Sequence, residues 1–149
     1  VVVTSSRDDK IARMRALGAD VGVNYRTTPA WGDRVRELTG GVDVVLENVG
    51  RPTLDESMNA CAPGATIVMI GTGPLPKELP KMPGFYQKNL WLKAISNGSR
   101  QMFEDLLAGL VTMKIQPVIE RRYTFEDAIA AFREMEAGDH VGKVLIRHG

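Results

Sequence analysis

The chain is poor in cysteine and histidine. Cys61 is the only cysteine among 149 residues, so no internal disulfide can form, and the composition suits a reducing compartment such as the cytoplasm. The two histidines, His140 and His148, have no metal-ligand spacing with Cys61, and we predict no metal site. No side chains have the pattern of a nucleophile with its base, so we also predict no catalytic residue.

Strong net charge and long apolar runs are missing as well. The formal net charge is +1, which argues against binding to nucleic acid or to a membrane surface through bulk charge. No apolar run approaches the roughly 18 residues of a membrane-spanning helix, and no charged-then-apolar leader precedes the first strand. We therefore expect neither a nucleic-acid partner nor a membrane partner.

Apolar runs alternate with amphipathic stretches along the whole chain. This alternation predicts an α/β fold with a doubly wound parallel sheet, because parallel strands need helical crossovers between them. Ser6, Ser99 and Thr124 are predicted to cap helices, and Pro63–Gly64 is predicted to form a turn. The predicted strands cover residues 1–4, 21–23, 42–47, 65–70, 92–95, 117–119 and 144–146. A proline-rich loop is predicted over residues 72–84.

The first strand is followed by hydroxyl and cationic residues. In a nucleotide-binding α/β sheet, the end of such a strand contacts the adenosine ribose, and an acidic residue there holds a free 2′-hydroxyl. This chain instead has Ser5 and Ser6 after Thr4, followed by Arg7 and Lys10. Hydroxyls and cations suit a 2′-phosphate, so the segment predicts NADP rather than NAD as cofactor.

A glycine-rich turn that would hold a pyrophosphate is absent. The chain begins within a strand at Val1, and no first strand with such a turn precedes it. We therefore expect a Rossmann-like sheet that lacks its first strand and belongs to a longer protein. Because that strand lies at the centre of the sheet, its loss leaves unpaired edges. Such edges favour a homo-oligomer or a domain-swapped dimer.

The ends of the later strands are the other candidate ligand-binding positions. Ligands of open α/β sheets bind at the carboxyl ends of the strands, which places Asn48 and Val49 near the adenosine or its ribose. Gly71 and Gly73 follow the next strand, where they either approach the cofactor or serve as ordinary turn glycines.

Six phrases carry a resemblance to a known superfamily. They are ALGAD-VGVNYR, VDVVLENVG, GATIVMIG, KNLWLKAISNGSR, TFEDAIAAF and GKVLI. Their order and spacing resemble the medium-chain dehydrogenase/reductase superfamily, which contains the zinc-type alcohol dehydrogenases and the NADPH quinone oxidoreductases. The resemblance covers essentially the whole chain and matches the second half of such an enzyme.

The resemblance implies roles for particular residues. In NADPH-using relatives, residues that match Lys10 and Tyr25 clamp the 2′-phosphate, with Ser5, Ser6 and Arg7 around the same point. The alternative is that Lys10 and Arg7 form a solvated helix face and Tyr25 is an edge residue. Backbone matching Ile70, Gly71 and Thr72 approaches the nicotinamide in relatives, and backbone matching Ala94 and Ser96 holds its amide.

The resemblance also implies a domain organisation. Residues 1–116 are expected to form a partial dinucleotide-binding domain. Residues 117–149 are expected to form a tail that returns to an N-terminal catalytic domain and exposes apolar surface. Because the zinc ligands of relatives lie mostly in that other domain, zinc is not expected in this chain.

The function implied for the parent enzyme is hydride transfer between NADPH and a carbonyl, a quinone or an activated alkene. We expect these 149 residues alone to be inactive. Two alternatives remain open. One is a non-catalytic nucleotide-binding or oligomerising module derived from the same fold, and the other is an unrelated doubly wound protein such as a methyltransferase-like domain.

Overall fold

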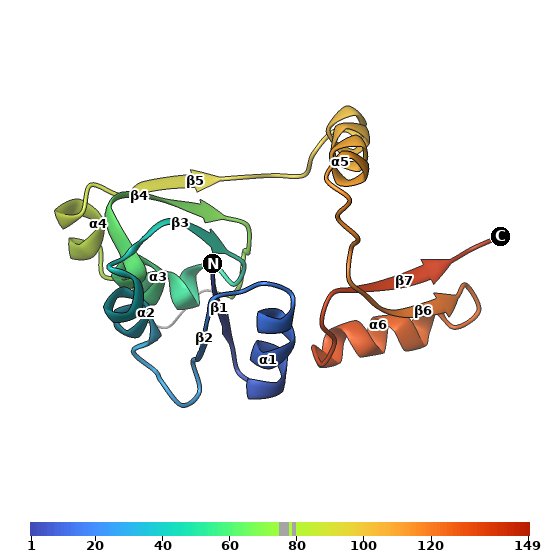
Figure 1. Ribbon diagram of the computed structural model, residues 1–149, viewed down its shortest axis with the longest axis horizontal. Helices are drawn as coiled ribbons and strands as arrows, with labels where there is room; N and C mark the ends of the chain where they lie inside the picture. The colour runs from blue at the N-terminus through green and yellow to red at the C-terminus, as the bar shows by residue number, and fades with distance from the viewer. Residues whose placement is uncertain (75–77, 79) are drawn as a thin grey trace. The chain divides into compact units, whose positions relative to one another are not determined.

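A computed structural model describes residues 1–74, 78 and 80–149, and the chain forms two compact units (Figure 1). The first unit is Val1–Asn97 and the second is Gly98–Gly149. The tail predicted for residues 117–149 lies within the second unit, and its return to another domain stays a prediction. No helix in the described ranges has both the length and the apolar character needed to cross a membrane.

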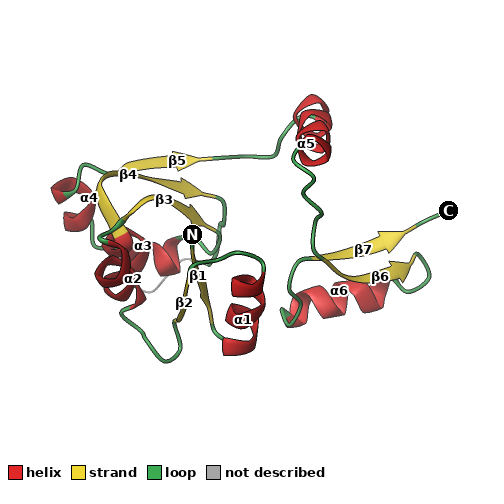
Figure 2. Ribbon diagram, in the orientation of Figure 1, coloured by secondary structure: helices red, strands yellow, loops and turns green. Residues whose placement is uncertain are grey.

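The first unit alternates strands and helices, as Figure 2 shows by colour. Short loops join most of these elements, which is typical of α/β units. In chain order they are β1 (Val2–Ser5), α1 (Asp8–Ala16), β2 (Val21–Asn24), α2 (Trp31–Thr39), β3 (Val42–Glu47), η1 (Arg51–Thr53), α3 (Leu54–Ala60), β4 (Cys61–Met69), α4 (Pro83–Gln87) and β5 (Trp91–Ala94).

All the strand pairs of the first unit are parallel. β1 pairs with β2, and a separate sheet has the order β3-β4-β5. Together with the helical crossovers, these parallel pairs confirm the predicted Rossmann-like α/β class. Since the carboxyl ends of parallel strands face the same way, the loops after β3 and β4 are neighbours, as are those after β1 and β2.

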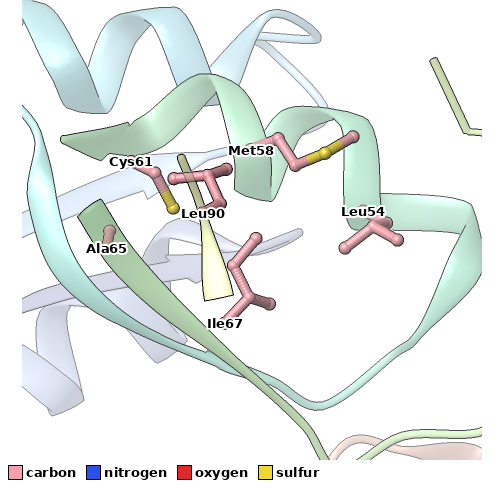
Figure 3. Packing of buried hydrophobic residues seen from close by; sticks show 6 residues of the cluster. All are labelled: Leu54, Met58, Cys61, Ala65, Ile67 and Leu90. Carbon is pink, nitrogen blue, oxygen red and sulfur yellow. The ribbon is translucent and has the colours of Figure 1, made fainter. Parts of the chain in front are cut away.

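The core of the first unit lies between α3 and the three-stranded sheet (Figure 3). Ile67 at the centre of β4 is fully buried, and it shares a cluster with Leu54 and Met58 of α3 and with Leu90. Val23 and Val35 form a second cluster with Ala60, which joins β2 to α2 and α3. Helix α3 thus contributes to both clusters and connects the two sheets.

The opposite face of the three-stranded sheet is open. Val44 and Leu46 of β3 are 58% and 63% exposed, and Trp91 of β5 is 63% exposed. The segment 42–47, with sequence VDVVLE, is predicted to be a buried strand, and this prediction is wrong for β3. The reason is that α3 covers only the face of Val45 and Ile67, and β3 is an edge strand of its sheet.

The second unit contains α5 (Arg100–Thr112), β6 (Ile119–Thr124), α6 (Ala128–Ala137) and β7 (Lys143–Arg147). β6 and β7 form a parallel pair. Phe125, Ile129 and Phe132 are each more than half exposed, which agrees with the apolar surface predicted for residues 117–149. The apolar face of α5 is exposed too, including Phe103 and Val111.

Local capping and turn predictions had mixed outcomes. Ser99 caps α5 as predicted, since its Oγ accepts from the Met102 amide at 3.2 Å. Ser6 and Thr124 do not cap helices, because α1 begins only after Arg7 and α6 only after Asp127.

The predicted turn at Pro63–Gly64 is wrong, because these residues lie inside β4. Between the pairs Val42–Cys61 and Val44–Thr66 the strand register shifts, and this irregularity accommodates Pro63 and Gly64. The proline-rich loop ends earlier than predicted, since α4 begins at Pro83, and its residues 75–77 and 79 lie outside the described residues.

Candidate functional site at the carboxyl ends of the strands

The carboxyl ends of β1 and β2 are joined to each other and to the start of α1. The Tyr25 amide donates to the Ser5 carbonyl at 3.0 Å, which continues the parallel ladder by one residue. The Asn24 side chain donates through Nδ2 to Asp8 Oδ1 at 2.8 Å, and its Oδ1 accepts from the Arg26 amide. Asn24 therefore links the turn that contains Tyr25 to the first turn of α1.

The predicted phosphate-binding residues gather at this end of the first sheet. Ser5 ends β1, Ser6 and Arg7 connect it to α1, Lys10 lies in the first turns of α1, and Tyr25 follows β2. Ser5, Ser6 and Lys10 are half-buried, and Tyr25 is 43% exposed.

Arg7 has a carboxylate partner. Its Nε donates to Asp9 Oδ1 at 2.9 Å and its Nη2 donates to Asp9 Oδ2 at 2.6 Å. This two-pronged pairing lowers the pKa of Asp9 from 3.8 to about 2, chiefly through the hydrogen bond from Arg7. The guanidinium predicted to attract a phosphate is thus paired with an anion of its own chain.

The loops after β3 and β4 are held together through their backbones. The Gly71 amide donates to the Glu47 carbonyl at 2.9 Å, and the Gly73 amide donates to the Val49 carbonyl at 2.8 Å. A Cβ atom on Gly71 would lie 2.1 Å from the Asn48 carbonyl oxygen, and one on Gly73 would lie 2.3 Å from that of Val49. Glycine is therefore required at both positions by contact between the loops, whatever ligand they bind.

Glu47, at the end of β3, is a buried carboxylate that sequence reasoning missed. Its side chain accepts hydrogen bonds from the Val49 and Gly50 amides, both at 2.9 Å, and from the Thr53 and Ser57 hydroxyls. It is 4% exposed. The available signal was an acidic residue that ends an apolar strand just before a small turn, as in VLENVG.

The remaining predicted residues lie at the same end of the three-stranded sheet. Val49 and Ile70 are 49% and 41% exposed, and Asn48 and Thr72 are exposed too. Ala94 ends β5 beside Met69, and the Ile95 amide continues the ladder by donating to the Met69 carbonyl at 3.2 Å. Ser96 follows two residues after Ala94 and is exposed.

The lone cysteine does not offer a reactive thiolate. Burial raises the pKa of Cys61 from 9.0 to about 11, and its Sγ donates to the Ser57 carbonyl. In the described ranges, no group of three or more His, Cys, Asp or Glu residues could hold a metal ion. The residues that the structure describes therefore do not fit zinc.

Two surface hollows are lined by other residues. One, of about 420 Å³, is lined by residues of 122–126 and 147–149 in the second unit. The other, of about 510 Å³, is lined by Phe85, Tyr86 and residues 89–92, at the beginning of β5. Neither hollow includes a predicted cofactor-binding residue.

The fold and the clustering of these residues at the strand ends define a Rossmann-like α/β protein. The family model for zinc-binding dehydrogenases matches residues 17–146. A zinc-type alcohol dehydrogenase-like protein of Schizosaccharomyces pombe is 31% identical over 153 residues, covering 99% of this chain and 44% of that protein.

Solved structures show the same likeness. An NAD-dependent alcohol dehydrogenase has a TM-score of 0.89 at 30% identity, covering 100% of this chain and 44% of that one. A quinone oxidoreductase from Thermus thermophilus, also solved with NADPH, has a TM-score of 0.76 at 29% identity, covering 99% of this chain and 49% of that one.

The chain belongs to the zinc-binding dehydrogenase family, and it corresponds to the C-terminal, cofactor-binding part of the medium-chain dehydrogenase/reductase superfamily. It spans less than half the length of the S. pombe relative.

Proposed function

We propose that this chain binds a nicotinamide dinucleotide, NADPH in preference to NADH, across the carboxyl ends of its parallel strands. The whole protein would transfer a hydride between NADPH and a carbonyl, a quinone or an activated alkene. The observation that carries the proposal is that the predicted residues gather at the carboxyl ends of their parallel strands, where ligands of such folds bind.

The 2′-phosphate would be held by Lys10 and Tyr25, with the Ser5 and Ser6 hydroxyls as further donors. The donor set suits a phosphate because an ammonium and a phenol both donate to its oxygens. Arg7 would contribute only if a phosphate replaced or shared its bond to Asp9. The family resemblance matches Lys10 to the lysine that holds the 2′-phosphate, so Lys10 is the cation whose removal should matter most.

The nicotinamide half would lie along the backbone at Ile70–Thr72, with Ala94 and Ser96 at its amide end. When bound, the dinucleotide supplies the hydride chemistry, and the protein orients it. The exposed strand-end segments of this chain would fix where the ring lies. No side chain here is proposed as a catalytic acid or base.

The similar proteins do not distinguish NAD from NADP as the cofactor, so the choice is argued from this chain's own residues. One similar structure is that of an NAD-dependent alcohol dehydrogenase, and another was solved with NADPH. The hydroxyls after β1, together with Lys10 and Tyr25, favour the phosphorylated form.

Self-association is a second part of the proposal. Among the described residues, β1 pairs only with β2 and β3 only with β4, and the exposed Val44 and Leu46 add apolar surface. We propose a homo-oligomer or a domain-swapped dimer on this basis. Sedimentation that gives a monomer at all concentrations would contradict this part.

The binding experiment is a calorimetric titration of the chain with NADPH and NADH. Tighter binding of NADPH is expected, and Lys10→Ala should weaken it by about tenfold or more, as one lost charge-assisted hydrogen bond implies. Arg34→Ala is the matched control, because Arg34 is an exposed cation on α2 that pairs with Glu37. Equal binding of the two dinucleotides, unaffected by Lys10→Ala, would refute the 2′-phosphate assignment.

A further inference from the structure

Glu47 is a buried charged side chain at the carboxyl end of β3, and the hydrogen bonds of its carboxylate go to the Val49 and Gly50 amides and to two hydroxyls. Of the charged residues in the described chain, it is the one that belongs to the buried set, at 4% exposure. Carboxylates are rarely buried without full hydrogen bonding, so the partners of Glu47 indicate what it does.

The two side-chain oxygens of Glu47 have different partners. Oε1 accepts from the amides of Val49 and Gly50 and from the Thr53 hydroxyl at 2.8 Å, so it holds the turn after β3. Oε2 accepts from the hydroxyl of Ser57, a fully buried residue of α3. One oxygen therefore shapes the loop, and the other attaches that loop to the core helix.

The backbone of Glu47 holds the neighbouring loop. Its carbonyl oxygen accepts from the Ile70 and Gly71 amides, both at 2.9 Å. Val49, oriented by the side chain of Glu47, accepts in turn from the Gly73 amide. Glu47 thus connects the two loops that carry Asn48 and Val49 on one side and Ile70, Gly71 and Thr72 on the other.

We propose that Glu47 is a positioning residue for dinucleotide binding: through Oε1 it fixes the loop after β3 in the conformation that sets the strand-end surface. This inference rests on the proposed function. The carboxylate holds the Val49 and Gly50 amides inward, so the outer side of the loop is presented to a ligand in one conformation. A preorganised loop binds more tightly because it loses less conformational freedom on binding.

The test compares three variants of the full chain. Glu47→Ala removes the acceptor of both loop amides and should weaken NADPH and NADH by the same factor, about tenfold. Glu47→Gln keeps the shape with a weaker, neutral acceptor and should weaken both by about threefold. Ser57→Ala is the matched control, because it removes the bond to Oε2 in the same buried region and leaves the Oε1 contacts in place.

The expected signature separates positioning from mere stability. Urea unfolding should show that Glu47→Ala and Ser57→Ala both destabilise the chain, whereas titration should show that only Glu47 variants lose dinucleotide affinity. The ratio of NADPH to NADH affinity should stay that of the unaltered chain, because the end of the β1–β2 pair is intact. If Glu47→Ala does not fold, the contrast between Glu47→Gln and Ser57→Ala decides the question.

Equal affinity losses in Ser57→Ala and the Glu47 variants, or no loss in the Glu47 variants, would overturn the inference while leaving the proposed function standing. Failure of the unaltered chain to bind either dinucleotide would overturn the proposed function and, with it, the inference.

Discussion

The Lys88 side chain closes the end of a core helix, and its removal should destabilise the first unit. Helix α3 ends at Ala60 and continues directly into β4, without a glycine in a left-handed conformation to satisfy its last carbonyls. Lys88 Nζ donates instead to the carbonyls of Met58, Asn59 and Cys61, at 2.7, 2.9 and 2.9 Å.

The magnitude follows from these three bonds. A hydrogen bond to a charged group contributes roughly 1.5–3 kcal/mol, but water can reach a half-buried lysine and replace part of this. A cation at a helix C-terminus adds about 0.3–1 kcal/mol. We expect Lys88→Met, which keeps an apolar stem of similar length, to lower the free energy of unfolding by about 2–4 kcal/mol.

The assay is urea unfolding followed by circular dichroism, with Lys81→Met as the control because Lys81 is exposed. A loss below about 0.5 kcal/mol, within the range of ordinary surface substitutions, would refute the reasoning and mean that water satisfies these carbonyls. The pKa of Lys88 is lowered mainly by burial, so the folded chain releases this proton before the unfolded chain does. The ionisation of Lys88 should therefore make the free energy of unfolding rise as pH increases towards 10.5. Lys88→Met should remove this pH dependence.

Three further predictions follow from single contacts. Asp9→Asn should weaken the pairing of Arg7 with this carboxylate and so tighten NADPH binding. Asp33→Asn, which weakens the Arg36 pair, is the control and should leave the affinity unchanged. Calorimetric titration that finds no gain with Asp9→Asn would show that Arg7 does not reach the phosphate. Cys61, with its pKa raised to about 11, should resist alkylation at pH 8.5 in the folded chain and react on unfolding, so rapid labelling of the folded protein would contradict its burial. The contribution of Cys61 to the free energy of unfolding is complete below pH 9.0 and is lost as pH rises towards about 11. Lys114→Gly should raise the free energy of unfolding by about 0.5–1 kcal/mol, as measured by urea unfolding. The reason is that Lys114 follows α5 with φ +55°, a left-handed conformation that glycine adopts without strain. An unchanged or lower stability would argue against that conformation.

Much of the fold could be predicted because its signals are local in the sequence. Parallel strands such as β2 and β4 appear as apolar runs between amphipathic segments, and Ser99 lies directly before the helix that it caps. Ser6 and Thr124 have the same composition signal, but α1 begins one residue later, with Arg7 as its extended N-cap, and α6 begins only after residues 125–127. Whether both faces of β3 are buried depends on which helices pack on its sheet. The sequence of residues 42–47 does not show which helices those are.

For the candidate site, the sequence predicts where the residues lie but not which hydrogen bonds they make. The rule that ligands bind at strand ends points to Ser5 and Asn48 without any structure, whereas Ile70 was proposed from the family resemblance. The pairing of Arg7 with Asp9 was missed because two adjacent aspartates at a helix start are usually solvated, and only geometry shows that one of them binds the arginine. The role of Glu47 depends on Ser57, ten residues away, and on the backbone of a second loop.

The central claim is that a dinucleotide binds at the carboxyl ends of β1 to β5. The most direct test is nuclear magnetic resonance mapping of the ¹⁵N-labelled chain as NADPH is added. We predict that amide shifts concentrate at residues 5–10, 25, 48–50, 70–73 and 94–96, and that shifts at residues 5–10 and 25 are smaller with NADH. Shifts gathered at the hollow lined by residues 85–86 and 89–92, at the opposite end of β5, or no shifts at all, would contradict the account.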